Sequence, residues 1–238
     1  MTRVVLITGG TRGLGLGIAT AFAAAGDTLV VCGRNAHDGP GRFFPCDVRD
    51  PAEVDALIAS ITATEGRLDV VVNNAGGSPS ALVSDASPRF AERIVALNLL
   101  GPLYVARAAR AVMTTGVILN IGSVAAVRPA PGTAAYAAAK AGLTVLTRAL
   151  ALEWAPAVRV NQITVGLLET ESSEHTYGDG VAVSATVPMG RMALPSDVAA
   201  ACVMLASDEL AYVTGADLFV DGGGEIPAFH AALGGTHG

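Results

Sequence analysis

Short runs of branched aliphatic residues alternate with longer Ala- and Leu-rich segments along the whole chain. Strands that are apolar on both faces are typical of a parallel sheet covered on both sides by helices. The longer segments have the length of crossover helices between such strands. The sequence therefore predicts a doubly wound α/β domain of about seven strands, with strand runs at 4–7, 29–31, 70–72, 117–119 and 158–160 and helices over 14–25, 52–65, 90–113 and 134–154.

Composition supports one folded unit. The 238 residues are 51% hydrophobic and 15% charged, which excludes a disordered chain. No linker, repeat or low-complexity block divides the sequence, so we expect a single domain over 1–238. A polar stretch within 166–190 lacks clear periodicity, and we expect that segment to form a substrate loop, followed at 225–238 by a C-terminal tail.

Charge and cysteine usage exclude several classes of partner. The net charge is −6, and Lys140 is the only lysine among 15 cations, so nucleic acid is not expected as a partner. Three scattered cysteines are too few for a disulfide framework or a metal knuckle, and we expect buried thiols and no metal site. The first residues lack the features of a signal peptide, and no apolar run reaches the roughly 18 residues of a membrane span. These features predict a cytoplasmic protein that does not enter membranes.

A glycine-rich turn follows the first predicted strand. Gly9, Gly13 and Gly15 are spaced G-x-x-x-G-x-G, and an Ala-rich helix comes next. Such glycines let backbone N–H groups and a helix N-terminus approach a pyrophosphate. The alternative is a tight turn without a ligand, but the position on the first strand of a doubly wound sheet favours dinucleotide binding.

A tyrosine and the only lysine stand one helical turn apart. Tyr136 and Lys140 lie at i and i+4 of a predicted helix, so they share one face. A phenol has a pKa near 10, and lowering it to neutrality requires about 4 kcal/mol, which a nearby ammonium in a dry pocket can supply. Ser123 follows the fifth apolar run, at the strand end where open α/β sheets bind ligands. The three residue types suit proton transfer to and from a substrate oxygen.

Several further motifs appear in the order typical of one family. Thr8 to Gly15 resembles the cofactor motif T-G-x-x-x-G-x-G of the short-chain dehydrogenase/reductase family, and Asn73 to Gly76 resembles its N-N-A-G motif. Asp47-Val48 is similar to its adenine-contacting pair, and Val220 to Gly223 is similar to its last strand and turn. The resemblance runs from about residue 3 to residue 224 and is greatest to bacterial 3-oxoacyl-(acyl-carrier-protein) reductase-like ketoreductases.

The resemblance implies hydride transfer between a nicotinamide and a carbonyl or carbinol carbon of a small ketone or secondary alcohol. It implies that Tyr136 exchanges the proton, that Ser123 orients the substrate, that Lys140 lowers the Tyr136 pKa, and that Asn98 anchors a water that relays protons. It also implies a homo-oligomer, either dimer or tetramer. The residues that it assigns to the cofactor are Gly9, Thr11, Arg12, Gly13, Leu14, Gly15, Arg34, Asp47, Val48, Asn74, Ala75, Gly76, Tyr136, Lys140, Leu168 and Thr170.

The second strand run ends without the acidic residue that usually binds the ribose of NAD. Gly33 stands near that place, followed by Arg34, and Arg12 lies inside the glycine turn. Two guanidinium groups suit the 2′-phosphate of NADP, which is the favoured cofactor. NAD stays possible, because the segment 35–41 is too short for the usual helix and Asp38 could then reach the ribose.

One departure from the family pattern lies beside the expected nicotinamide site. The chain has Val165-Gly166 where relatives have Pro-Gly, which removes a backbone restraint and predicts a looser or reshaped wall. His175 and Tyr177 either touch substrate or form a solvated loop surface, and the second interpretation is favoured. Two other functions stay open for the fold: a dinucleotide-binding sensor or scaffold, and an epimerase that retains its cofactor.

Overall fold

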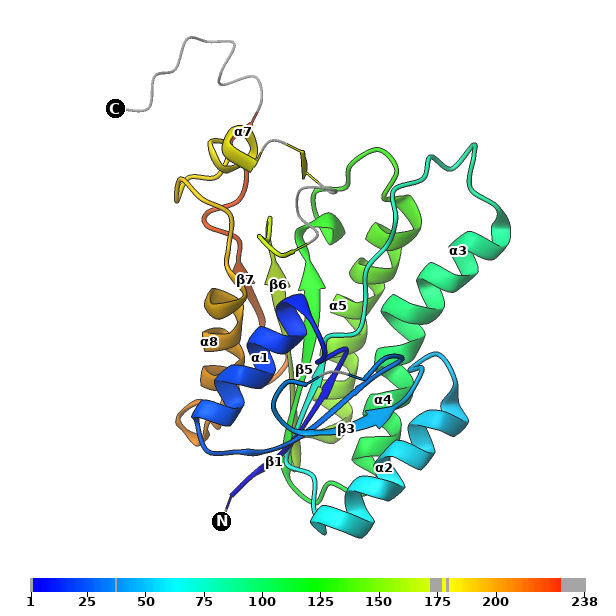
Figure 1. Cartoon of the computed structure of the whole chain (residues 1–238), viewed down its shortest axis with the longest axis vertical. Helices are drawn as coiled ribbons and strands as arrows, with labels where there is room; N and C mark the ends of the chain where they lie inside the picture. The colour runs from blue at the N-terminus through cyan, green and yellow to red at the C-terminus, as the bar shows by residue number, and fades with distance from the viewer. Residues whose placement is uncertain (1, 37, 172–176, 179, 228–238) are drawn as a thin grey trace.

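The computed structural model describes residues 2–36, 38–171, 177–178 and 180–227. They form one seven-stranded parallel sheet between two layers of helices (Figure 1), which confirms the predicted doubly wound fold. The strand order is β3-β2-β1-β4-β5-β6-β7. The strands are β1 Val4–Thr8, β2 Thr28–Gly33, β3 Arg42–Pro45, β4 Val70–Asn73, β5 Gly116–Ser123, β6 Val158–Val165 and β7 Asp217–Val220.

The helices divide between the two faces of the sheet. Figure 1 shows α1 and α8 on one side and α2, α4 and α5 on the other. The helices of the described residues are α1 Gly13–Ala24, α2 Pro51–Glu65, α3 Pro88–Val95, α4 Gly101–Arg110, α5 Ala134–Trp154, α7 Gly180–Ser184 and α8 Pro195–Leu205. None of them is long and apolar enough to cross a membrane.

Alternate residues of each strand enter two separate cores. In β1, Leu6 packs with the α2, α4 and α5 side, while Val5 and Ile7 pack with the α1 and α8 side. All three are fully buried. Successive strand side chains point to opposite faces, so burial on both faces requires an unbroken apolar run. Each such side chain contributes about 1.5–3 kcal/mol when removed from water.

Local signals fix the ends of several helices. Asp50 caps α2 by accepting from the Ala52 N–H at 2.9 Å, and the helix ends at Gly66, which has a φ of 73°. Ser87 caps α3 by accepting from the Phe90 N–H at 3.2 Å. Capping side chains of this kind contribute about 1 kcal/mol each.

The predicted helix over 90–113 is interrupted. The chain is helical from α3 through α4, but the π-helical turn Ala96–Leu100 separates the two. Within it the Asn98 side-chain amide donates to the Ile94 carbonyl at 2.9 Å. The prediction of one continuous helix was therefore wrong, because a buried asparagine bonds the backbone of the preceding turn.

The segment between β2 and β3 has no helix among its described residues, as predicted. His37 lies outside the described residues, as do His175, His230, His237 and the tail beyond residue 227. The three cysteines are buried and free, as predicted. Within the described residues no group of three His, Cys, Asp or Glu side chains is placed to hold a metal.

Candidate active site

The glycine-rich turn is fastened to the end of β4. The Thr8 hydroxyl accepts from the backbone N–H groups of Asn74 and Ala75 at 3.1 and 3.0 Å. The Asn74 amide donates to the carbonyls of Thr8 and Gly9 at 3.0 and 3.1 Å. A Cβ at Gly15 would lie 2.1 Å from the Gly9 carbonyl oxygen, so that position requires glycine. Thr8 itself was not predicted as a site residue, although it opens the first motif.

The start of α1 fits the pyrophosphate of a dinucleotide. Gly9 and Gly13 have φ values of 63° and 51°, which bend the strand directly into the helix. No side chain caps α1 at Arg12, and its first turn holds no acidic residue. The first N–H groups and the positive end of the helix dipole therefore face a place suited to an anion.

Two arginines start from neighbouring backbone positions beside this turn. A Cβ at Gly33 would lie 3.4 Å from the Thr11 methyl. The residues that directly precede Arg34 and Arg12 are therefore in close contact. Both side chains are exposed, and neither forms an ion pair with another described residue. Asp47 is held by Arg49, and its pKa is lowered mainly by that bond and slightly by the charge of Arg34.

Ser123 and Tyr136 meet at the carboxyl edge of the sheet. Ser123 ends β5, where its hydroxyl also accepts from the Ala125 N–H at 3.2 Å. Tyr136 lies in the first turn of α5, close to Ser123. Burial raises the pKa of Tyr136, and the nearby Ser123 side chain offsets this only in part. The phenol therefore holds its proton at neutral pH.

Lys140 is buried beneath Tyr136, as their spacing predicts. Its ammonium donates to the Ile121 carbonyl at 2.7 Å and lies 5.7 Å from the centre of the Tyr136 ring. Burial lowers the pKa of Lys140 to about 8. Burial is the largest influence on the pKa of each of the two groups. The expectation that Lys140 lowers the Tyr136 pKa stays a prediction.

Asn98 reaches the same place from the π-helical turn. It is fully buried, accepts from the Gly77 N–H at 2.9 Å and donates to the Gly77 carbonyl at 3.0 Å. A Cβ at Gly76 would lie 2.9 Å from the Asn98 oxygen and 3.4 Å from the Lys140 nitrogen. The absence of a side chain at Gly76 therefore keeps these two polar groups close to each other.

The wall after β6 is held by neighbouring strands. Val165 is buried and pairs with Ser123 on one side and Val220 on the other, so β6 continues through this position. Leu168 forms a β-bridge with Ala193. These pairings supply the restraint that a proline would otherwise give.

Two residues of this wall reach the rest of the site. A Cβ at Gly13 would lie 3.7 Å from the Thr170 methyl, so Thr170 borders the glycine turn. Tyr177 is partly buried, and its charge raises the pKa of Tyr136 slightly. Burial raises the pKa of Tyr177, and a backbone hydrogen bond at Leu168 partly offsets this.

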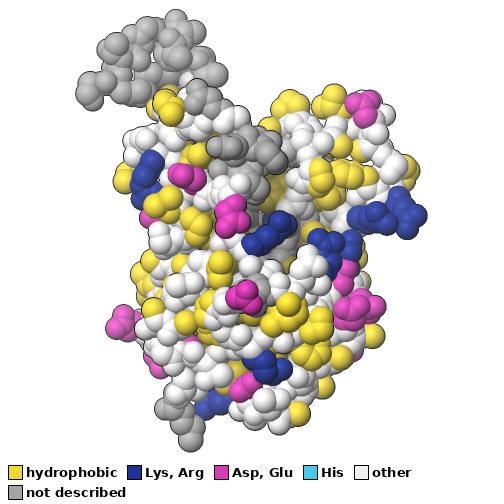
Figure 2. Space-filling model, in the orientation of Figure 1, with side chains coloured by type: hydrophobic (Ala, Val, Ile, Leu, Met, Phe, Trp, Pro, Cys, Tyr) yellow, Lys and Arg dark blue, Asp and Glu magenta, His cyan; other side chains and the backbone are white. Residues whose placement is uncertain are grey.

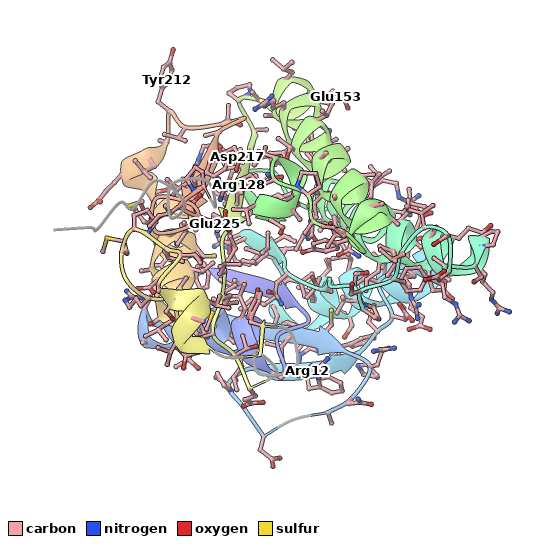
Figure 3. The ribbon with its side chains drawn as sticks, turned by 90° about the horizontal axis from the view of Figure 1, so that it is seen from above. Arg12, Arg128, Glu153, Tyr212, Asp217 and Glu225 are labelled. Atoms are coloured by element: carbon pink, nitrogen blue, oxygen red, sulfur yellow. The ribbon has the colours of Figure 1, made fainter. Side chains whose placement is uncertain are left out.

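Arg128 forms two ion pairs with residues that follow β7, and we call this cluster the ionic clasp. Arg128, five residues after Ser123, pairs with Asp221 at 3.1 Å and with Glu225 at 2.6 Å. Figure 3 shows Arg128 beside Glu225 and well away from Arg12. Figure 2 shows that the surface of the molecule is hollowed at the end that carries α3 and α7 in Figure 1. The clasp cannot be predicted from the sequence, because no local pattern links residues more than 90 positions apart.

Comparisons with known proteins find similar chains over most of this sequence. A family model described as Enoyl-(Acyl carrier protein) reductase matches residues 9–225. D-threitol dehydrogenase from Mycolicibacterium smegmatis is 35% identical over 93% of this chain and 92% of that protein. The 3-oxoacyl-(acyl-carrier-protein) reductase of Escherichia coli is 34% identical over 93% and 96%. The ligand-free structure of aldohexose dehydrogenase from Thermoplasma acidophilum gives a TM-score of 0.90 at 30% identity and covers 93% of both chains.

Proposed function

The chain belongs to the short-chain dehydrogenase/reductase family, and on that premise we propose that it reduces a small ketone to a secondary alcohol with NADPH. It is an oxidoreductase acting on alcohol or carbonyl groups with NAD(P)(H). The observation that carries the proposal is the meeting of Ser123, Tyr136 and Lys140 beside the glycine-rich turn.

The proton and the hydride come from different sources. When bound, the nicotinamide supplies the hydride. Tyr136 donates its phenolic proton to the carbonyl oxygen, and its raised pKa keeps that proton available at neutral pH. The Ser123 hydroxyl hydrogen-bonds the same oxygen and stabilises the charge that develops there. With a pKa of about 8, Lys140 is mostly charged at pH 7 and holds a positive charge below the phenol, and it would also hold the cofactor ribose.

Removing the Tyr136 hydroxyl tests the proposal. Tyr136→Phe keeps the ring but lacks the proton, so we expect turnover of ketones to fall by about 100-fold or more. NADPH binding, measured by cofactor fluorescence, should change by less than about twofold because the ring and Lys140 remain. The matched control is Tyr212→Phe, since Tyr212 is fully exposed on the surface. A Tyr136→Phe enzyme with an unaltered rate would sink the mechanism.

Assays of the wild-type protein with NADPH and a set of ketones also distinguish the proposed reaction from the two other functions. NADPH binding without oxidation by any ketone favours a sensor or scaffold. Product formation without net oxidation of the cofactor favours an epimerase. Both readings come from absorbance of NADPH together with product analysis on the same samples.

The preference for NADPH rests on Arg12 and Arg34. Two exposed guanidinium groups without ion-pair partners among the described residues suit a 2′-phosphate. We expect Arg34→Ala to weaken NADPH binding about tenfold or more and NADH binding by less than about twofold. Arg148→Ala, which removes an exposed arginine from α5, is the control. Equal losses for both cofactors would remove the assignment.

The remaining expectations belong to the same proposal. Residues 1–238 act as one domain in the cytoplasm, and the segment 166–190 covers the substrate. Val145 and Leu152 on α5 are 65% and 85% exposed, and burying them supports assembly into a homodimer or homotetramer. Sedimentation equilibrium measures the oligomeric state directly.

A further inference from the structure

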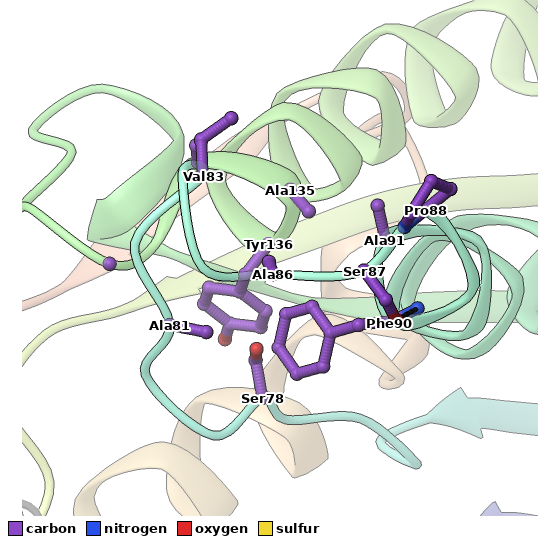
Figure 4. A pocket seen from close by; sticks show the side chains of 12 residues that line it. Ser78, Ala81, Val83, Ala86, Ser87, Pro88, Phe90, Ala91, Ala135 and Tyr136 are labelled. Carbon is purple, nitrogen blue, oxygen red and sulfur yellow. Dashed lines mark hydrogen bonds between the residues drawn. The ribbon is translucent and has the colours of Figure 1, made fainter.

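A cavity of about 290 Å³ opens beside Tyr136. It lies between the chain that follows β4 and the first turns of α3 and α5, and we call it the α3 pocket. Figure 4 shows Ser78 and Phe90 projecting into it from one side and Tyr136 from the other. The pocket therefore adjoins the hydroxyl that delivers the proton, and a group attached to the reacting carbon can extend into it.

The walls of the α3 pocket carry no charged side chain. Five alanines, a valine, a proline and a phenylalanine form most of its surface. An ionised substituent would give up part of its water there without gaining a counter-charge, which is unfavourable. Carboxylate, phosphate and ammonium groups are therefore poor occupants.

Its few hydroxyl groups are mostly engaged. Ser87 accepts from the Phe90 N–H at 3.2 Å as the cap of α3. Ser78 donates to the Pro79 carbonyl at 2.8 Å, which leaves only its lone pairs for a ligand. Tyr136 is committed to the reacting oxygen. A polyhydroxylated substituent would place several hydroxyls against this surface with few hydrogen-bond partners, which is unfavourable.

The shape of the pocket is fixed by the backbone around it. The Ala81 N–H donates to the Gly132 carbonyl at 3.1 Å, which joins the two sides. A Cβ at Gly132, whose φ is 83°, would lie 2.2 Å from the Ser80 hydroxyl, so the close approach of these two segments requires glycine. Phe90 stands in the first turn of α3, where Ser87 and Pro88 fix the start of the helix.

We propose that the α3 pocket receives the larger substituent of the substrate and that this substituent is an uncharged apolar ring. The substrate class is then aryl or alicyclic ketones and their alcohols, rather than sugars, linear polyols or acyl-carrier thioesters. This inference rests on the proposed ketone reduction. Phe90 is the residue that sets the size limit, because its ring stands across the pocket from Tyr136.

Filling the pocket tests the inference. We expect wild-type enzyme to prefer acetophenone and cyclohexyl methyl ketone over dihydroxyacetone. Phe90→Trp should lower kcat/KM for the ring ketones about tenfold or more and change it for 2-butanone by less than about twofold. Ala86→Leu fills the pocket from the loop that precedes α3 and should act in the same sense, which guards against a defect specific to the Phe90 substitution. Glu92→Gln, exposed on α3 and outside the pocket, is the control.

A binding measurement separates this inference from the proposed reaction. Acetophenone binding to Tyr136→Phe protein is followed by saturation-transfer NMR, with Phe90→Trp added to the same background. If Phe90→Trp abolishes acetophenone binding, the pocket is supported. If wild-type enzyme at the same time reduces no ketone, the proposed reaction is overturned and the pocket is not. A preference for dihydroxyacetone, or acetophenone kinetics and binding that neither filling variant changes, would overturn the pocket while leaving the reaction standing.

Discussion

Replacing Lys140 by methionine is expected to make the protein more stable while removing its activity. The Lys140 side chain is 4% exposed, and burial lowers its pKa from 10.5 to about 8. At about 1.4 kcal/mol per pH unit, holding this ammonium charged at pH 7 costs the folded state about 3 kcal/mol. Methionine has a similar length and carries no charge, so it removes the cost without leaving a large cavity.

The hydrogen bond that Lys140 makes opposes part of this gain. Its ammonium donates to the Ile121 carbonyl at 2.7 Å, and a bond of this kind contributes about 1.5–3 kcal/mol. We therefore expect Lys140→Met to be more stable than wild type by about 1 kcal/mol at neutral pH. Turnover should be lost in the same protein, because the positive charge below Tyr136 is gone.

The dependence on pH gives the sharper measurement. Between about pH 8 and about pH 10.5 the unfolded chain binds the lysine proton and the folded chain does not, so wild-type stability rises with pH. We expect wild type to gain about 2 kcal/mol relative to Lys140→Met between about pH 7 and about pH 9.5. The advantage of the variant is full below the folded pKa and fades above it.

Urea unfolding followed by far-ultraviolet circular dichroism measures these differences at each pH. Arg148→Met is the matched control, since it removes an exposed cation from the same helix and should change stability by less than about 0.5 kcal/mol. The reasoning is refuted if Lys140→Met and wild type stay parallel over this range. A variant that is less stable than wild type at every pH would refute it equally.

Three further perturbations follow from the site. Arg128→Met breaks both ion pairs of the clasp and should raise KM for the ketone up to about fivefold with little change in kcat, measured by steady-state kinetics. Gly15→Ala places a methyl group 2.1 Å from the Gly9 carbonyl and should cost about 2 kcal/mol or more, seen as an earlier urea midpoint. Asn98→Ala leaves the Gly77 N–H without its partner and should lower the melting temperature by about 5–10 °C. Unchanged values in these assays would contradict the respective contacts.

Local patterns predict the sheet and the central residues of the site. The apolar runs predict the strands because burial on both faces acts on consecutive residues. Tyr136 and Lys140 share a helix face because their spacing alone sets it. The apolar runs do not locate the short strand Arg42–Pro45, since Arg-Phe-Phe between a glycine and a proline forms too short a pattern.

Other properties depend on contacts between distant segments. The raised pKa of Tyr136 follows from the elements that bury it, and no spacing within α5 expresses that burial. The pairing of Arg128 with Glu225 depends on how the chain after β5 meets the chain after β7. In the sequence Phe90 is an ordinary apolar residue of an amphipathic helix. Its place in a pocket beside Tyr136 follows only from the packing of α5 near α3. Side-chain packing over long sequence separations therefore decides what the local patterns leave open.

The π-helical turn Ala96–Leu100 also sets how far α4 is rotated about the helix axis relative to α3. α3 directs Phe90 toward the α3 pocket, whereas α4 buries Val105 and Ala109 against the sheet. One residue advances an α-helix by about 100°, so deleting any single residue of this turn would rotate one helix against the other by that amount. Either the pocket or the core would then face solvent. A π-helical turn contains one more residue than an α-helical turn. This residue lets α3 face the α3 pocket while α4 faces the sheet, which one uniform α-helix could not do.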